Sequence, residues 1–303
     1  MSLKLLALAG VALADPSINV TEDQAGSGAT YAKTVYVAGS SWAPPVASAT
    51  GFSLPHSGRA YLATKNECGR FSPDMYYAPN LLGGSIEYDF DLSQASCGCN
   101  AALYLISMPG YDKDGNALPS TGKDYYCDAN KVGGVWCPEM DIMEANQYAW
   151  HLTPHRCDAP DGKSYPSCDR SGCGKSIHHM DGNAYGPGSQ YRIDTTKRFH
   201  AKIDFNEATK DTLTSIVLTL TQDTDLFTMT IADEDCAAGY LSDMTKPIKD
   251  GMTMAISNWG DVGTDMSWLD GDTGCKENCG GDPTVYVTNI VYKTVNPTGP
   301  TPV

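Results

Sequence analysis

The sequence predicts an all-β protein built as a β-sandwich, and three observations support this fold class. Short segments that are apolar throughout, or that alternate apolar and polar residues, recur along the chain, as at residues 85–92 and 101–107. Alternation with a period of two is typical of a half-buried strand, because successive side chains point to opposite faces. Turn clusters such as residues 112–116 separate these segments, and no segment keeps a helical period for long. Many short strands at this spacing are typical of a sandwich.

The predicted strands begin weakly and become clear after about residue 81. Residues 31–60 are rich in Ala, Ser, Gly and Pro, and their best strand signal lies at residues 34–37. Residues 233–245 have the pattern of one short helical turn. No internal repeat divides the chain, so we expect a single domain over residues 15–295. The clear strands are predicted at residues 85–92, 101–107, 190–194, 199–205, 213–220, 226–231, 251–256 and 285–292.

The two ends of the chain differ in composition from this domain. Residues 1–14 combine Lys4, a short apolar run and Ala-Leu-Ala at the end, the pattern of a secretory signal peptide cleaved near Ala14. The alternative is a short membrane anchor, but the apolar run has about ten residues, roughly half of what a span needs. We therefore expect a secreted, extracellular protein without a membrane partner. Residues 296–303 are rich in Pro and Thr and are predicted to be a disordered tail.

Composition narrows the possible partners and cofactors. The 303 residues carry a formal net charge of −15, which argues against nucleic acid as a partner. Eleven cysteines in a secreted chain predict a disulfide framework, and their odd number leaves at least one thiol outside it. A zinc site is the alternative, but residues 97–99 and 168–173 lack matching ligand pairs elsewhere. The adjacent His178 and His179 suggest no metal either, so we expect no metal and no cofactor.

Three carboxylates within six positions are the most informative motif of the chain. Glu139 and Asp141 share one face of a predicted strand, whereas Glu144 points to the other face of an ideal strand. A β-bulge or a strand end between Asp141 and Glu144 would bring all three onto one groove. The alternative is three surface acids on a loop, but the flanking residues are apolar. Carboxyl groups placed so close together shift one another's pKa values, as a retaining glycosidase requires of its nucleophile and its acid.

The motif and its surroundings resemble glycoside hydrolase family 7, the fungal cellobiohydrolase and endoglucanase family. That family has Glu-x-Asp-x-x-Glu followed by Ala-Asn, and this chain has the same pattern at residues 139–146. The resemblance covers about residues 75–295 and is poor before that. It implies a jelly-roll sandwich of two large antiparallel, concanavalin-like sheets with a concave substrate groove. Further similar segments lie at residues 81–94, 97–104, 152–157, 185–189, 191–197, 258–259 and 266–270, the last two expected as tryptophan-bearing strands.

The resemblance implies a role for each acidic residue. Glu139 matches the nucleophile and Glu144 the general acid/base, while Asp141 is expected to hydrogen-bond Glu139 and tune it. The chemistry agrees, because a glycosidic oxygen needs a proton donor and the oxocarbenium-like transition state needs a carboxylate beneath it. The two carboxyl groups of a retaining pair are expected to lie about 5–5.5 Å apart.

Other residues carry over as substrate contacts. The resemblance places His155 near the leaving-group sugar, and its alternative role is that of a structural histidine. The two tryptophans are expected to be platforms for sugar rings, and their alternative place is the sandwich core. The substrate-binding set is Asn100, Tyr104, Tyr126, Asp128, His155, Trp259 and Trp268. The same comparison implies disulfides 127–137, 157–168, 173–236 and 97–275, and leaves Cys68, Cys99 and Cys279, of which two are free to pair.

Departures from the family pattern favour the endoglucanase branch over the cellobiohydrolases. The loop between Cys157 and Tyr185 is short, Lys163 stands near a product-side arginine position, and Met143 replaces a common tryptophan. Fewer loop residues imply an open cleft, so we expect a monomeric retaining endo-β-1,4-glucanase acting on cellulose or a related β-glucan. A cellobiohydrolase, a mixed-linkage glucanase, a xylanase or a transglycosylase would use the same machinery. A non-catalytic wall-binding protein is the alternative outside enzymes.

Overall fold

The structure is a computed structural model that describes residues 14–24, 29–40, 44–208, 211–260 and 265–295. The proposed signal peptide, except for Ala14, and the proline-rich tail lie outside these ranges. Within them, no helix is long and apolar enough to cross a membrane. Strands are the main regular structure of the described residues, the helices are few and short, and the predicted all-β sandwich is confirmed.

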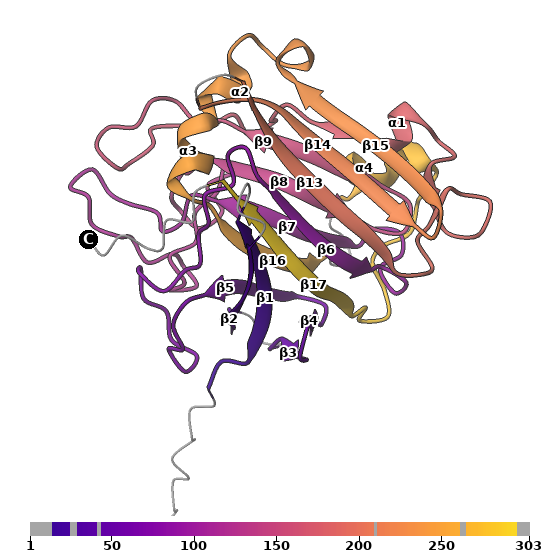
Figure 1. Ribbon diagram of the computed structural model, residues 1–303, viewed down its shortest axis with the longest axis horizontal. Coiled ribbons are helices and arrows are strands. Elements are labelled where there is room, and N and C mark those ends of the chain that lie inside the picture. The colour runs from indigo at the N-terminus through magenta and orange to yellow at the C-terminus, as the bar shows by residue number, and fades with distance from the viewer. Residues whose placement is uncertain (1–13, 25–28, 41–43, 209–210, 261–264, 296–303) are drawn as a thin grey trace, which may run out of the picture.

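The chain up to residue 176 supplies the first ten strands (Figure 1). Their bounds are β1 Ser17–Gln24, β2 Ala29–Gly39, β3 Val46–Ala47, β4 Gly51–Leu54, β5 Gly58–Ala63, β6 Ser85–Asp91, β7 Asn100–Ile106, β8 Glu139–Ala145, β9 Trp150–His155 and β10 Lys175–Ser176. The second half adds β11 Tyr185–Gly186, β12 Ile193–Asp194, β13 Phe199–Ala208, β14 Thr212–Gln222, β15 Asp225–Ala232, β16 Thr253–Trp259 and β17 Val285–Thr294.

Helices are short and lie at the ends of the strands. They are α1 Ile177–Met180, α2 Tyr240–Asp243, α3 Thr245–Asp250 and α4 Ser267–Asp270, with 3-10 turns η1 Asp233–Asp235 and η2 Gly271–Thr273. Two expectations were wrong here. The strand predicted at residues 266–270 is absent, because residues 267–270 form α4. The strand predicted at residues 190–194 shrinks to β12, because residues 187–192 make turns and bends after Gly186.

All strands except β11 and β12, which form a small sheet of their own, join into one hydrogen-bonded sheet that folds over itself as two layers. Its order is β10-β9-β8-β7-β16-β5-β2-β1-β17-β6-β13-β14-β15, with β4 pairing β17 and β3 beside it. The layer of β6, β13, β14 and β15 lies over β7, β8 and β9 (Figure 1). Neighbours within each layer are antiparallel, and the link between the layers is the parallel pair β1–β17. The two sheets expected from the sequence are therefore the two halves of one mixed sheet.

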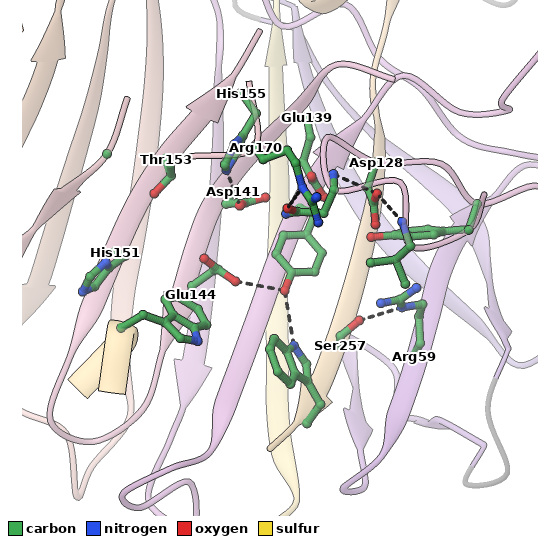
Figure 2. A pocket seen from close by; sticks show the side chains of 18 of the residues that line it. Arg59, Asp128, Glu139, Asp141, Glu144, His151, Thr153, His155, Arg170 and Ser257 are labelled. Atoms are coloured by element: carbon green, nitrogen blue, oxygen red, sulfur yellow. Dashed lines mark hydrogen bonds and ion pairs between the residues drawn. The ribbon is translucent and has the colours of Figure 1, made fainter. Parts of the chain in front are cut away.

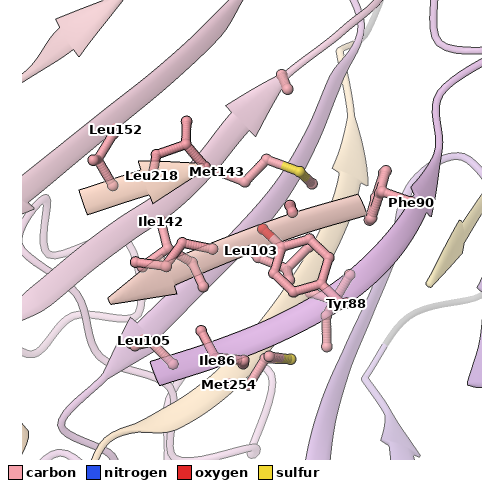
Figure 3. Packing of buried hydrophobic residues seen from close by; sticks show 14 of the residues in the cluster. Ile86, Tyr88, Phe90, Leu103, Leu105, Ile142, Met143, Leu152, Leu218 and Met254 are labelled. Atoms are coloured by element: carbon pink, nitrogen blue, oxygen red, sulfur yellow. The ribbon is translucent and has the colours of Figure 1, made fainter. Parts of the chain in front are cut away.

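The core lies between the two layers and consists of one face of each. Ile142, Leu103 and Met254 from one layer meet Ile86 and Leu218 from the other, all fully buried (Figure 3). Alternation explains this packing, because the residues between them point to the opposite face of each strand. The concave side of β7, β8, β9 and β16 is therefore left for other side chains.

Trp150 is the largest fully buried side chain and begins β9 beside the motif. Its ring packs at 6.2 Å from Tyr185 and 6.1 Å from Phe199. We expect Trp150→Ala to lower the free energy of unfolding by about 3–5 kcal/mol, because it leaves a cavity in a close-packed core. Urea denaturation measures this loss. Trp150→Phe is the matched control and should lose clearly less, since the buried indole N–H has no partner to lose. A loss for Trp150→Ala below about 1 kcal/mol would contradict the packing described.

Five disulfides tie loops to the sheet. Those predicted at 127–137, 157–168, 173–236 and 97–275 are all present, Cys99 pairs with Cys279, and Cys68 is the free cysteine of the described residues. The Cys127–Cys137 bridge closes the loop that leads directly into β8. This loop reaches the concave face, since Asp128, Asn130 and Val132 line the groove there.

Candidate active site

A β-bulge on β8 places the three carboxyl side chains on one face. Leu103 of β7 pairs with Met143 and Tyr104 pairs with Asp141, so Ile142 is an extra residue without a partner in this register. The register against β9 shifts over the same interval, between Asp141 and Glu144. Because of the extra residue, Ile142 and Met143 both face the core while Glu139, Asp141 and Glu144 all line the groove (Figure 2). The predicted bulge is confirmed.

The groove has a volume of about 1090 Å³ and lies over the concave face. Strand β8 supplies the carboxyls, β7 supplies Tyr104, and β9 supplies three polar side chains at alternate positions. All predicted site residues except Asn100 line it. Asn100 is fully buried beside the groove and acts through Glu144 instead.

Glu144 is held by two donors from β7. Asn100 Nδ2 donates to Glu144 Oε1 at 3.0 Å, and the Tyr104 hydroxyl donates to the same oxygen at 3.1 Å. Tyr104 in turn accepts a hydrogen bond from Trp259 Nε1 at 3.3 Å. Asn100 Oδ1 also accepts from the Ala145 backbone N–H, which fixes the amide beneath the carboxyl. The orientation of Glu144 is therefore set by a network of neighbouring strands.

Glu139 is buried at the opposite end of the motif. Its Oε2 accepts a hydrogen bond from the Ala129 backbone N–H at 3.0 Å, so the Cys127–Cys137 loop orients it. Asp128, on the same loop, accepts backbone hydrogen bonds from Asn130 and Val132 and so shapes the loop around the carboxyl. Only one hydrogen-bond donor reaches Glu139 among the described residues, so the carboxyl keeps a free edge toward the groove.

Asp141 pairs with His155 rather than with Glu139, which differs from the expectation. Asp141 Oδ2 lies 3.0 Å from His155 Nε2, and His155 Nδ1 donates to the Asp169 carbonyl at 2.9 Å. His155 stands directly opposite Glu139 on β9, so Asp141 is its diagonal neighbour and within reach. Since Nδ1 must carry a proton to bond a carbonyl, one further proton is shared between Nε2 and Asp141. The Oδ1 atom of Asp141 is buried without a partner.

Burial raises the pKa of all three carboxyl groups. For Glu139 it raises the pKa well above the usual range, and the nearby charges of Asp141 and Asp128 add to this. For Asp141 burial acts with the charge of Glu144. For Glu144 burial also raises the pKa, but the Asn100 and Tyr104 hydrogen bonds oppose it. Glu144 is therefore the carboxyl whose rise in pKa is opposed by two side-chain hydrogen bonds, a setting that suits a group that gives up and regains a proton.

Tyr104→Phe tests this balance. It removes a donor that favours ionised Glu144, so the pKa of Glu144 should rise, while the ring keeps its packing. If Glu144 must be protonated to act, activity falls as pH rises through its pKa, and the variant should keep activity to higher pH than the parent. The basic limb of a kcat/KM profile against pH measures the shift. Tyr286→Phe, on the exposed side of β17, is the control. A limb that stays in place, or moves to lower pH, would contradict the role of this hydrogen bond.

The two tryptophans form a stacked pair at the edge of the groove. Their ring centroids are 6.4 Å apart with an interplanar angle of 28°. Trp268, on α4, is 45% exposed, which excludes a role in the sandwich core. Trp259 packs partly on Ala149, Met266 and Leu269, so it supports the platform from beneath.

Several groove residues were not predicted from the sequence. Arg59 of β5 lies over the Tyr126 ring at 4.0 Å and donates to Ser257 Oγ at 2.9 Å. Alternation along its strand could have indicated that Arg59 faces the groove. The sequence before residue 75, however, shows only weak strand patterns. Loop residues carry no periodic signal at all. The remaining unpredicted lining includes His151, Thr153, Arg170 and His179.

Metal-binding potential is low in the described part of the chain. The one compact group of candidate ligands there is Cys97, Asp270 and Cys275. Both cysteines are joined in a disulfide, so their sulfurs are not free thiolates.

A mixed sheet folded into two layers, with buried carboxyls lining a groove on its concave face, defines a protein of the jelly-roll class. Residues 123–235 match the family model described as Glycosyl hydrolase family 7. Endoglucanase type C of Fusarium oxysporum is 30% identical over 289 residues, 80% of this chain and 65% of the relative. Endoglucanase EG-1 of Trichoderma longibrachiatum is 30% identical over 310 residues, 88% of this chain and 65% of the relative. The chain thus spans about two thirds of the length of these relatives.

Solved structures agree in fold. The native endocellulase EGI of Humicola insolens superposes with a TM-score of 0.75 at 22% identity, covering 94% of this chain and 98% of that one. A family 7 cellobiohydrolase of Daphnia pulex gives 0.73 at 17% identity, covering 96% and 99%. With these matches, the chain resembles glycosyl hydrolase family 7, and the similar curated proteins quoted above are endoglucanases. The resemblance inferred from the sequence is confirmed.

Proposed function

We propose that the protein is a secreted, monomeric, retaining endo-β-1,4-glucanase that hydrolyses cellulose or a related β-glucan by double displacement. The observation that carries the proposal is the bulge at Ile142, which turns Glu144 onto the groove face with Glu139 and Asp141. A bulge that turns two consecutive residues, Ile142 and Met143, toward the core and brings three acids onto the groove face has a clear use in glycoside cleavage.

Each carboxyl then has a step to perform. Glu139 attacks the anomeric carbon while Glu144, protonated, gives its proton to the departing glycosidic oxygen. A glycosyl ester forms on Glu139 as the bond to the leaving sugar breaks. Glu144, now ionised, takes a proton from water, and that water releases the sugar from Glu139 with the original configuration. Asp141, paired with His155, adjusts the charge between the two without a bond to either.

Internal cleavage is favoured over release from chain ends by two observations. The curated relatives are named endoglucanases, and the loop between Cys157 and Tyr185 is short. A short segment leaves less chain to close over the groove. An endo-acting enzyme should lower the viscosity of soluble cellulose well before many reducing ends appear. Cellobiose as the dominant early product would instead support a cellobiohydrolase.

A reducing-sugar assay on soluble cellulose, barley glucan and xylan tests the proposal. We expect release from soluble cellulose, with the β-anomer as the first product seen by NMR, because two displacements retain configuration. The α-anomer would contradict the retaining mechanism. A preference for barley glucan or xylan would show that one of these, and not cellulose, is the substrate. Transfer of the glycosyl group to an added sugar in place of water would indicate a transglycosylase. Binding without any release would favour the wall-binding alternative.

A further inference from the structure

Strand β9 places one side chain opposite each carboxyl of β8. His155 pairs with Glu139, Thr153 with Asp141 and His151 with Glu144. These partners alternate along β9, so all three share the groove face, and all three line the groove. Directly opposed residues of an antiparallel pair have Cβ atoms about 4.5–5.5 Å apart. His151 therefore stands beside the carboxyl proposed to donate the proton.

His151 also contacts the tryptophan platform. Its ring centroid lies 6.1 Å from that of Trp268 with an interplanar angle of 88°, an edge-to-face contact. The Leu269 backbone takes part in a hydrogen bond with the imidazole, which ties β9 to α4. One ring nitrogen is thereby used, and no other hydrogen-bond partner reaches the ring within the described ranges. The second nitrogen is available to a ligand in the groove.

The two ends of the motif have different surroundings. His151 and both tryptophans gather around Glu144. Trp259 donates to Tyr104, which donates to Glu144, and Trp268 contacts the rings of Trp259 and His151. His155 and the Cys127–Cys137 loop gather around Glu139. Figure 2 shows the same separation, with His151 beside Glu144 and with Arg170 and His155 beside Glu139.

This separation identifies the side on which the leaving sugar rests. The proton from Glu144 goes to the bridging oxygen, which departs with the leaving sugar. That sugar must therefore lie on the Glu144 side of the cleavage point, where Trp268 offers an exposed aromatic face. A pyranose on this face presents its hydroxyl groups at the ring edge, and His151 is in edge-to-face contact with the same indole.

We propose that His151 binds a hydroxyl group of the leaving sugar and so determines the preference for a sugar as leaving group. Burial lowers the pKa of His151, aided by the charge of His179 and opposed by the Leu269 hydrogen bond, Asp272 and Asp270. A neutral imidazole that donates to the Leu269 carbonyl has an acceptor nitrogen for a sugar O–H. His179 and Asp272, joined at 2.7 Å, border the same end of the groove.

Leaving-group dependence tests the proposal, which rests on the function proposed above. The enzyme and its variants are assayed on cellotetraose, whose leaving group is a sugar, and on β-cellobiosyl fluoride, whose leaving group is fluoride. His151→Ala should lower kcat/KM on cellotetraose by about 10–100-fold, the range for a lost hydrogen bond plus poorer positioning. On the fluoride the loss should stay within about threefold, because no sugar needs to be held.

Two further variants complete the test. His151→Gln keeps an acceptor and should recover part of the loss on cellotetraose alone. His178→Ala, whose side chain does not line the groove, should behave as the parent. An equal loss on both substrates, or no loss on cellotetraose, would overturn the proposal for His151. A parent enzyme inert toward both substrates would instead overturn the proposed function, and with it this inference.

Discussion

Replacing Glu139 by Gln is expected to reduce kcat on soluble cellulose by at least about 10⁴-fold, as is usual when a covalent nucleophile is removed. An amide is a poor nucleophile and cannot form the glycosyl ester. The fold should persist, since Gln has the same shape and its carbonyl oxygen can accept the hydrogen bond from the Ala129 N–H. The free energy of unfolding should stay equal or rise, because a buried group that resists ionisation becomes neutral.

Activity and thermal unfolding are measured together for this variant. Glu234→Gln, at an exposed position of η1, is a matched control that should change neither. A Glu139→Gln enzyme with near-normal turnover would show that another group attacks the sugar. A large fall in the unfolding temperature would show instead that Glu139 is needed for the structure.

Replacing Glu144 by Gln should have an effect that depends on the leaving group. For cello-oligosaccharides, which need protonation, we expect a fall in kcat/KM of about 10²–10⁴-fold, the usual contribution of a positioned acid. The fluoride of β-cellobiosyl fluoride leaves without help from a strong acid, so formation of the glycosyl-enzyme from this substrate should be far less affected. The second step still lacks its base, so the glycosyl-enzyme should accumulate on the fluoride.

Added azide separates these two steps. Azide attacks without deprotonation, so it should restore turnover of the fluoride by Glu144→Gln and produce a β-glycosyl azide. The same anion should not restore turnover of cellotetraose, because proton donation is still missing. Equal losses on both substrates with no azide effect would contradict the acid/base role of Glu144.

The site was predictable from the sequence where it follows local pattern. The spacing of Glu139, Asp141 and Glu144 conflicts with strict alternation, and the conflict itself indicated a bulge. Its position could be limited to the interval after Asp141 because Ile142 and Met143 are both apolar. The failure of strict strand alternation at these residues therefore pointed to the functional site itself.

Contacts between distant segments were not predictable in the same way. The Asp141–His155 pair depends on the register of β9 against β8, which no short-range pattern specifies. Trp268 lies on a single-turn helix, which is too short for periodicity to give a signal. Arg59 comes from a weakly patterned segment, although it lies over Tyr126 in the groove. Tertiary packing decided each of these positions.

The parallel contact between β1 and β17 has a consequence for how the molecule is made. β17 is the last described strand to leave the ribosome, yet it lies in the middle of the sheet between β1 and β6. The Cys97–Cys275 and Cys99–Cys279 bridges span 178 and 180 residues and also wait for late segments. Pairing between such distant residues is slow because chain closure must precede it. During synthesis the edges of β1 and β6 therefore stay open, and a nascent chain would depend on factors that shield strand edges until β17 arrives.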